Sequence, residues 1–184
     1  ENGDDHEDEE DVHEEDPHIW LDPVIAKRMV EVIRDLLIEV DEEGRVEYEA
    51  NAAVALTKLD ELHERYRLGL SSCELDHLII SHASIGYLAR RYGFQMVAVS
   101  GLSPEEEPSP RKMAEIADLV RAEGVGHILF EMTMSPAIAD TIAREAGATT
   151  LVFNNLESPT EEETDYFVAM EDNLEVLKTA LQCR

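Results

Sequence analysis

The chain has 184 residues, a formal net charge of −27 and 43% hydrophobic residues, so it can bury the core of one ordinary domain. The negative charge argues against nucleic acid and anionic membrane surfaces as partners, because both would repel it. No apolar run approaches the roughly 20 residues that span a bilayer. The first residue is Glu rather than Met, so the lack of a leader peptide says nothing about compartment.

An extremely acidic stretch opens the chain. Residues 1–16 hold eleven carboxylates, two histidines and one apolar side chain. This composition cannot offset the entropy of ordering, so we expect a solvated, flexible loop. His6 and His13 among these carboxylates are candidate weak, auxiliary metal ligands, since both groups bind zinc. The alternative is a charge run that only keeps the protein soluble.

Two helices are predicted next. Asp22 followed by Pro23 is typical of a helix start, and apolar residues recur at helical spacing until about Val40. Gly44 separates this helix from a second one over residues 45–70, where apolar residues again recur every three or four positions. A helix of about 24 residues would be about 36 Å long, enough to run the length of a lobe or to join two lobes.

From Cys73 onward the pattern is strand, loop, helix, repeated four times. The strands are expected at 77–81, 95–100, 127–131 and 149–154, and the helices at 85–92, 110–123, 136–146 and about 163–181. This alternation is typical of an α/β fold, here a four-stranded parallel sheet with helices on both faces.

The carboxyl ends of parallel strands are where open α/β sheets bind their ligands. Here those ends offer His82, Glu131 and Asn154, with Glu157 nearby. No serine lies in a nucleophile elbow and no glycine-rich phosphate loop is present, so covalent or phosphoryl-transfer catalysis is poorly supported. A lone histidine at a strand end is more often a structural residue than a ligand.

A second histidine, His18, lies in the proline-bracketed segment DPHIWLDP, residues 16–23. Our hypothesis is that His18 and His82 approach one metal ion. Neutral imidazole suits Zn²⁺, whereas harder oxygen ligands suit Mn²⁺. A ligating imidazole normally donates its other N–H to a carboxylate or carbonyl, and for His82 we expect that partner in Glu131 or the loop 102–107.

Several motifs occur in one order: DPHIWLDP, the long helix, SHASIGYLARRYGF, GLSPEEEPSP and FEMTMSP. Together they closely resemble the ZnuA/TroA-like substrate-binding proteins of zinc and manganese ABC importers. The resemblance implies two α/β lobes joined by a long backbone helix, with the metal held between them. It divides this chain into an acidic, His-containing loop (1–16), a remnant of the N-terminal lobe (17–44), the linker helix (45–70) and the C-terminal lobe (71–184).

The resemblance also implies a set of ligands. His18 and His82 match family ligands, and a further histidine would come from an N-terminal lobe that this chain lacks, so zinc binding is expected to be weakened or absent. The last ligand is usually an Asp in the turn where Asn154 stands here. An Asn carbonyl, water, Glu131 or Glu157 would have to replace it.

Two cysteines complete the inventory. From the count alone, Cys73 and Cys183 suit either one disulfide or two buried free thiols. The resemblance implies the disulfide, because zinc members of the family often link a cysteine before the SHA strand to one at the C-terminus.

The function implied is that of a binding protein, not an enzyme. It would capture extracytoplasmic Zn²⁺, with Mn²⁺ as second choice, and deliver it to the permease of an ABC importer. It would be periplasmic or a membrane-anchored surface lipoprotein. Two alternatives remain: a zinc-dependent hydrolase, although no HExxH-like helix is present, and a surface adhesion lipoprotein.

Overall fold

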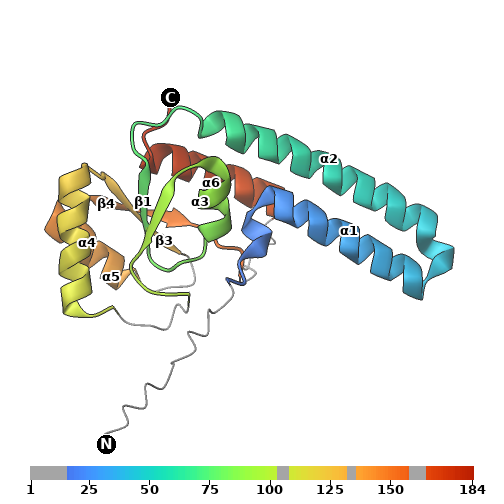
Figure 1. Ribbon diagram of the computed structural model, residues 1–184, viewed down its shortest axis with the longest axis horizontal. Coiled ribbons are helices and arrows are strands. Elements are labelled where there is room, and N and C mark those ends of the chain that lie inside the picture. The colour runs from blue at the N-terminus through green and yellow to red at the C-terminus, as the bar shows by residue number, and fades with distance from the viewer. Residues whose placement is uncertain (1–15, 103–107, 132–135, 158–164) are drawn as a thin grey trace, which may run out of the picture.

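The computed structural model describes residues 16–102, 108–131, 136–157 and 165–184. It consists of a sheet-containing lobe from which a helical hairpin projects (Figure 1). Most of the acidic segment, including His6 and His13, lies outside the described residues, as does nearly all of the loop 102–107. Among the helices of the described residues, none is both long and apolar enough to cross a membrane.

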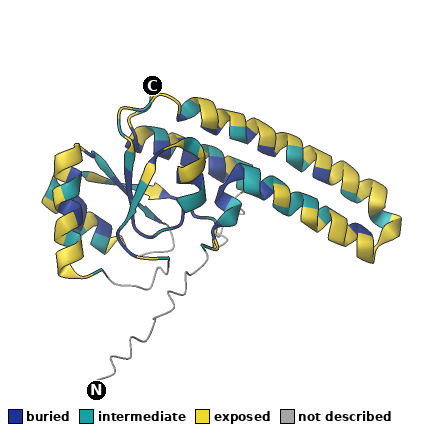
Figure 2. Ribbon diagram, viewed as in Figure 1, coloured by how far each residue is buried: buried dark blue, intermediate teal, exposed yellow. Residues whose placement is uncertain are grey.

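The hairpin consists of α1 (Pro23–Val40) and α2 (Arg45–Gly69), joined by the 3-10 turn η2 (Glu42–Gly44). The Asp22 carboxylate caps α1 by accepting from the backbone N–H of Val24 at 2.8 Å, as its position before Pro23 predicts. The helices run antiparallel, and their distal halves are largely exposed (Figure 2). The end of α2 nearest the lobe is the most deeply buried part of that helix, through Leu59, Leu62 and Tyr66.

The lobe is built on a four-stranded parallel sheet with the order β2-β1-β3-β4. Its strands are β1 (His77–Ile80), β2 (Gln95–Ala98), β3 (His127–Glu131) and β4 (Thr149–Phe153). The chain passes from β1 outward to β2, and then returns to add β3 on the other side of β1. The strand order therefore reverses between β1 and β3, which is where such sheets bind ligands.

Helices cover both faces of the sheet, which confirms the predicted fold class. They are α3 (Gly86–Tyr92), α4 (Pro110–Glu123), α5 (Ala137–Ala146) and α6 (Tyr166–Ala180). Successive residues of β1 enter opposite cores, because side chains alternate along a strand. Ile79 packs into the core formed with α4 and α5, whereas Leu78 and Ile80 pack into the core shared with α2, α3 and α6.

The predicted disulfide between Cys73 and Cys183 is present. It joins the segment after α2 to the segment after α6. Backbone hydrogen bonds flank it on both sides, from Glu74 N–H to the Gln182 carbonyl at 3.3 Å and from Arg184 N–H to the Ser72 carbonyl at 3.0 Å. The disulfide therefore closes the lobe by fastening its first residues to the C-terminus.

Candidate metal centre

His18 is almost completely buried, at 2% exposure, just before the short 3-10 helix η1 (Ile19–Leu21). Its Nδ1 lies 2.7 Å from an Asp16 carboxylate oxygen, which also accepts the His18 backbone N–H at 3.0 Å. A carboxylate accepts hydrogen bonds, so Asp16 favours the tautomer that carries the imidazole hydrogen on Nδ1. In that tautomer Nε2 carries a lone pair that can bind a cation.

Three contacts fasten this segment to the lobe. The Tyr87 hydroxyl donates to the Asp16 carbonyl at 3.0 Å, and the Tyr166 hydroxyl donates to the Trp20 carbonyl at 2.8 Å. Burial raises the pKa of Tyr166, so its hydroxyl stays protonated and able to donate. Arg91 pairs with the Asp22 carboxylate at 2.6 Å. His18 is thus held on the lobe that carries His82, although the two residues are 64 positions apart.

His82 follows β1 and is fully buried. Its Nδ1 is hydrogen-bonded to the carboxylate of Glu131, the last residue of the neighbouring strand β3, as the sequence predicted. Glu131 is also fully buried and accepts from the hydroxyl groups of Ser81, at 3.0 Å, and Ser84. Because it faces Nδ1, Glu131 orients His82 from the side of the ring away from Nε2. Glu131 was a candidate both for the hydrogen-bond partner of His82 and for a metal ligand. This geometry supports the role of hydrogen-bond partner.

The free nitrogens of the two histidines face each other, with Nε2 of His18 3.2 Å from Nε2 of His82. A Glu157 carboxylate oxygen, Oε1, lies 2.9 Å from the first and 3.8 Å from the second. Among the described residues, these three form a group that could hold a metal ion. Tetrahedral Zn²⁺ with Zn–N of about 2.0–2.1 Å places its ligand atoms about 3.3 Å apart, so the spacing fits zinc.

The turn after β4 decides which oxygen joins the histidines. The Asn154 side-chain oxygen accepts the backbone N–H of Leu156 at 3.0 Å, so it serves the turn itself. Asn154 had been expected at the ligand position, but the side chain that faces the histidines is Glu157, one of the alternatives. Trp20 Nε1 donates to the Asn155 carbonyl at 2.8 Å and so ties this turn to the His18 segment.

Other histidines lie elsewhere. His127 Nδ1 is 2.8 Å from the Thr149 hydroxyl, and His77 pairs with Asp76, both at the opposite ends of their strands. His63, on α2, is 3.0 Å from the Tyr92 hydroxyl. None of the three belongs to the group formed by His18, His82 and Glu157.

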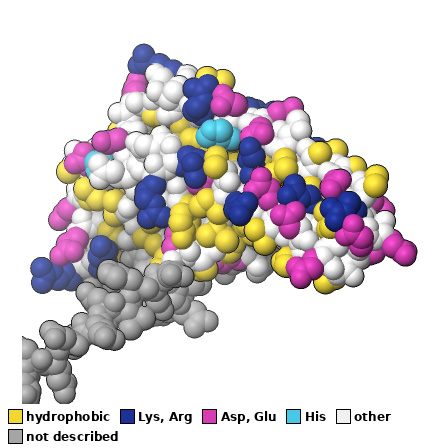
Figure 3. Space-filling model, turned by 45° about the vertical axis from the view of Figure 1, so that its right-hand side comes forward, with side chains coloured by type: hydrophobic (Ala, Val, Ile, Leu, Met, Phe, Trp, Pro, Cys, Tyr) yellow, Lys and Arg dark blue, Asp and Glu magenta, His cyan; other side chains and the backbone are white. Residues whose placement is uncertain are grey.

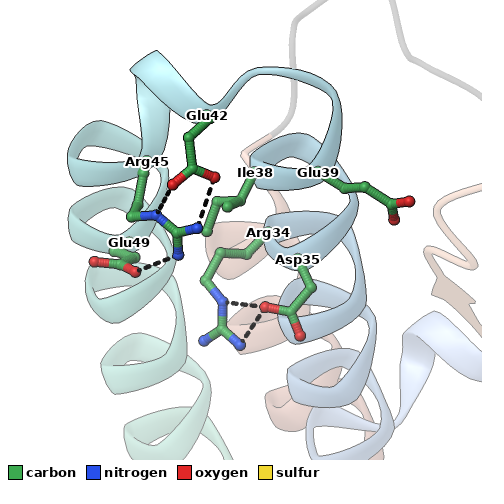
Figure 4. A pocket seen from close by; sticks show the side chains of 7 residues that line it. All are labelled: Arg34, Asp35, Ile38, Glu39, Glu42, Arg45 and Glu49. Carbon is green, nitrogen blue, oxygen red and sulfur yellow. Dashed lines mark hydrogen bonds and ion pairs between the residues drawn. The ribbon is translucent and has the colours of Figure 1, made fainter.

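Polar pockets also occur away from the histidines. One pocket of about 510 Å³ lies at the tip of the hairpin (Figure 4), where Arg45 pairs with Glu42 and Glu49 and Arg34 pairs with Asp35. Acidic and basic side chains lie side by side in the same way over much of the visible surface (Figure 3). Both arginines of this pocket are paired with carboxylates, and no histidine lines it, so it lacks the nitrogen ligands found at His18 and His82.

Comparison with known proteins supports a zinc-binding lineage. The zinc-binding lipoprotein AdcA of Streptococcus pneumoniae strain R6 is 44% identical over 178 residues, which are 95% of this chain and 36% of AdcA. The high-affinity zinc uptake system protein ZnuA of Bacillus subtilis is 38% identical over 173 residues, 92% of this chain and 54% of that protein. The chain thus spans about a third to a half of these relatives.

Solved structures agree with this lineage. The Zn(II)-bound ZnuA-like domain of Streptococcus pneumoniae AdcA matches with a TM-score of 0.78 and 42% identity, over 90% of this chain and 64% of that one. The laminin-binding protein Lbp of Streptococcus pyogenes matches with a TM-score of 0.85 and 34% identity, over 90% and 65% of the two chains. The family model for ZnuA, the periplasmic component A of the zinc-uptake complex, matches residues 1–180. The chain belongs to this ZnuA family.

Proposed function

We propose that this protein is the extracytoplasmic component of a zinc importer, which captures Zn²⁺, with Mn²⁺ as second choice, and delivers it to an ABC permease. The observation that carries the proposal is the convergence of His18 Nε2, His82 Nε2 and Glu157 Oε1. Three electron-pair donors at these distances repel one another unless a proton or a metal ion lies between them, and a single metal ion can bind all three. Two imidazoles and one carboxylate are a typical zinc ligand set.

The metal in this reading is cargo, and the protein's own residues prepare its site. Asp16 and Glu131 each face Nδ1 of one histidine and favour the tautomer whose Nε2 lone pair can bind zinc. The histidines are 2% and 0% exposed, so water competes little for their lone pairs. The site therefore needs little rearrangement when zinc arrives.

A fourth donor would complete the tetrahedron, and we assign it to a preceding lobe, as the family resemblance implies. In this division residues 17–44 are the remnant of that lobe, 45–70 the linker helix and 71–184 the C-terminal lobe. The surface of α1 supports the assignment, because Val32, Ile33 and Leu36 are 43%, 54% and 56% exposed. An apolar face of this size on so acidic a chain is typical of a surface that packs against another part of the protein.

Isothermal titration of the full chain with Zn²⁺ and Mn²⁺ tests the proposal. His82→Ala and Glu157→Gln each remove one donor, and zinc affinity should fall by more than the roughly 10- to 100-fold typical of changes to outer partners of a metal site. His127→Ala removes a histidine remote from the site and is the matched control. Equal affinity in the parent and the His82 variant would refute the assignment.

The alternatives make different predictions in the same preparation. One solved relative, Lmb of Streptococcus agalactiae, is described as bifunctional, with adhesin and metal-transporting activity. An adhesion protein would bind matrix protein equally with or without the His82 substitution, and a zinc hydrolase would cleave ester or peptide substrates in proportion to bound zinc. Metal transfer without either activity is the outcome expected here.

A further inference from the structure

Glu157 is presented by an unusual turn after β4. Leu156 adopts a φ of +58°, a left-handed conformation that residues other than glycine rarely adopt. Asn173 on α6 holds the start of the turn, since its side chain accepts from Asn154 N–H at 2.9 Å and donates to the Asn154 carbonyl at 2.7 Å. The backbone is therefore bent and fastened just before Glu157.

Asn155 contacts Glu157 twice from within this turn. Its side-chain oxygen accepts the Glu157 backbone N–H at 3.3 Å, and its amide nitrogen donates to Glu157 Oε2 at 2.9 Å. The orientation of the amide follows from the chemistry, because an N–H requires an oxygen acceptor and a carboxylate requires a donor. Asn155 is 1% exposed, whereas the Glu157 side chain is 26% exposed, so the amide holds the carboxylate from the buried side.

The two carboxylate oxygens of Glu157 thus have different roles. Oε2 is held by Asn155, and Oε1 faces the histidines. Asp16 and Glu131 act on the histidines in the same way. Each is hydrogen-bonded to Nδ1 of one ring, so that Nε2 is the atom directed at the site. Each of the three residues consequently directs a single ligand atom at a common point.

We infer that Asn155 is a specificity-determining positioning residue that keeps Glu157 monodentate. The inference rests on the proposed zinc-binding function. Zn²⁺ in protein sites favours four ligands in a tetrahedron, whereas Mn²⁺ favours oxygen ligands in an octahedron. A carboxylate free to bind through both oxygens would add a ligand and suit Mn²⁺. Because Asn155 keeps Oε2 hydrogen-bonded and away from the metal, it favours binding of Zn²⁺ over Mn²⁺.

Asn155→Ala and Asn154→Ala form a matched pair for the test. Each removes an asparagine side chain and one hydrogen bond to a backbone N–H of the turn, but only Asn155→Ala also frees Glu157 Oε2. Asn155→Asp is the second variant, since it retains an oxygen acceptor for the Glu157 N–H while losing the amide donor. Circular dichroism and urea unfolding check that each variant folds.

Two readouts are measured on the full chain. The first is the ratio of Zn²⁺ to Mn²⁺ affinity, from competition against a chromophoric chelator, which should fall about tenfold in Asn155→Ala and stay within about twofold of the parent in Asn154→Ala. The second is the visible spectrum with Co²⁺ in place of zinc. Four-coordinate Co²⁺ absorbs visible light strongly, and Co²⁺ with more ligands absorbs weakly. The absorption should therefore weaken in the Asn155 variants.

The outcomes separate the inference from the function on which it rests. A parent protein that carries the preceding lobe and still binds no zinc overturns both. Zinc binding with an unchanged ratio and Co²⁺ spectrum in Asn155→Ala and Asn155→Asp overturns the inference alone. An equal fall of the ratio in Asn154→Ala also overturns it, because the effect would then come from the turn as a whole.

Discussion

Replacing Glu131 with Gln should weaken zinc binding although Glu131 is assigned no contact with the metal. The carboxylate is fully buried and accepts hydrogen bonds from His82 Nδ1 and from the hydroxyls of Ser81 and Ser84. Glutamine has nearly the same shape but no charge, and its amide can also donate a hydrogen bond. His82 could then carry its hydrogen on Nε2, the form that cannot bind a metal.

The size of the effect follows from the contact that is lost. A hydrogen bond to a charged group contributes about 1.5–3 kcal/mol, and about 1.4 kcal/mol corresponds to a tenfold change in affinity. Removing the Glu131 charge should therefore weaken zinc binding by about 10- to 150-fold. The same range is typical of changes to groups that hold a metal-ligating histidine.

Zinc affinity is measured by chelator competition on the full chain, with Ser84→Ala as the control. That substitution removes one donor to Glu131 but keeps the carboxylate against His82, so its effect should stay within about threefold. Urea unfolding shows whether either variant loses its fold. Zinc affinity of Glu131→Gln within twofold of the parent, with the fold intact, would refute the role given to the charge.

Three further predictions concern stability and signal. Replacing Cys73 and Cys183 with Ser opens a loop with a sequence separation of 110, so the free energy of unfolding should fall by up to about 4.8 kcal/mol in urea titrations, and an unchanged value would contradict this. Burial raises the pKa of Tyr66 well above its usual value, so above pH of about 10 the unfolded chain loses a proton that the folded chain retains. Stability should then fall by up to about 1.4 kcal/mol per pH unit, and Tyr66→Phe should flatten this fall. Trp20 is the one tryptophan and bonds to the Asn155 carbonyl, so zinc titration should change its fluorescence in the parent but not in His82→Ala.

Local chemistry explains which parts of the fold could be predicted. The first helix begins and ends at Pro23 and Val40 as expected, because its cap and its first-turn proline are adjacent in sequence. The start of α6 was less accurate, expected near 163 and found at Tyr166, where the Asp165 side chain accepts the backbone N–H groups of Phe167 and Val168. Several acidic and Thr residues precede Tyr166, and local sequence does not distinguish which one caps the helix.

Strand ends were overestimated for a different reason. The strand expected to end at Ser100 ends at Ala98, and the one expected to end at Ser81 ends at Ile80. Apolar pattern marks residues that can be buried, whereas the length of a strand depends on its partner. Between β1 and β3 only two residue pairs are in register, Ile79 with Ile128 and Ile80 with Leu129. Pairing of that kind is set by the tertiary fold.

The proposed third ligand, Glu157, shows where sequence reasoning reaches its limit. Asn154 and Glu157 were both candidates, and choosing between them requires the direction of each side chain, which depends on the backbone between them. That backbone turns at Leu156 with a positive φ, which propensity disfavours for a residue that is not glycine. The two residues before Leu156 are held from distant parts of the chain, Asn154 by Asn173 of α6 and Asn155 by Trp20 of the His18 segment. The turn that aims Glu157 is therefore a product of the assembled lobe, and a substitution at Trp20 or Asn173 should impair zinc binding without touching a ligand.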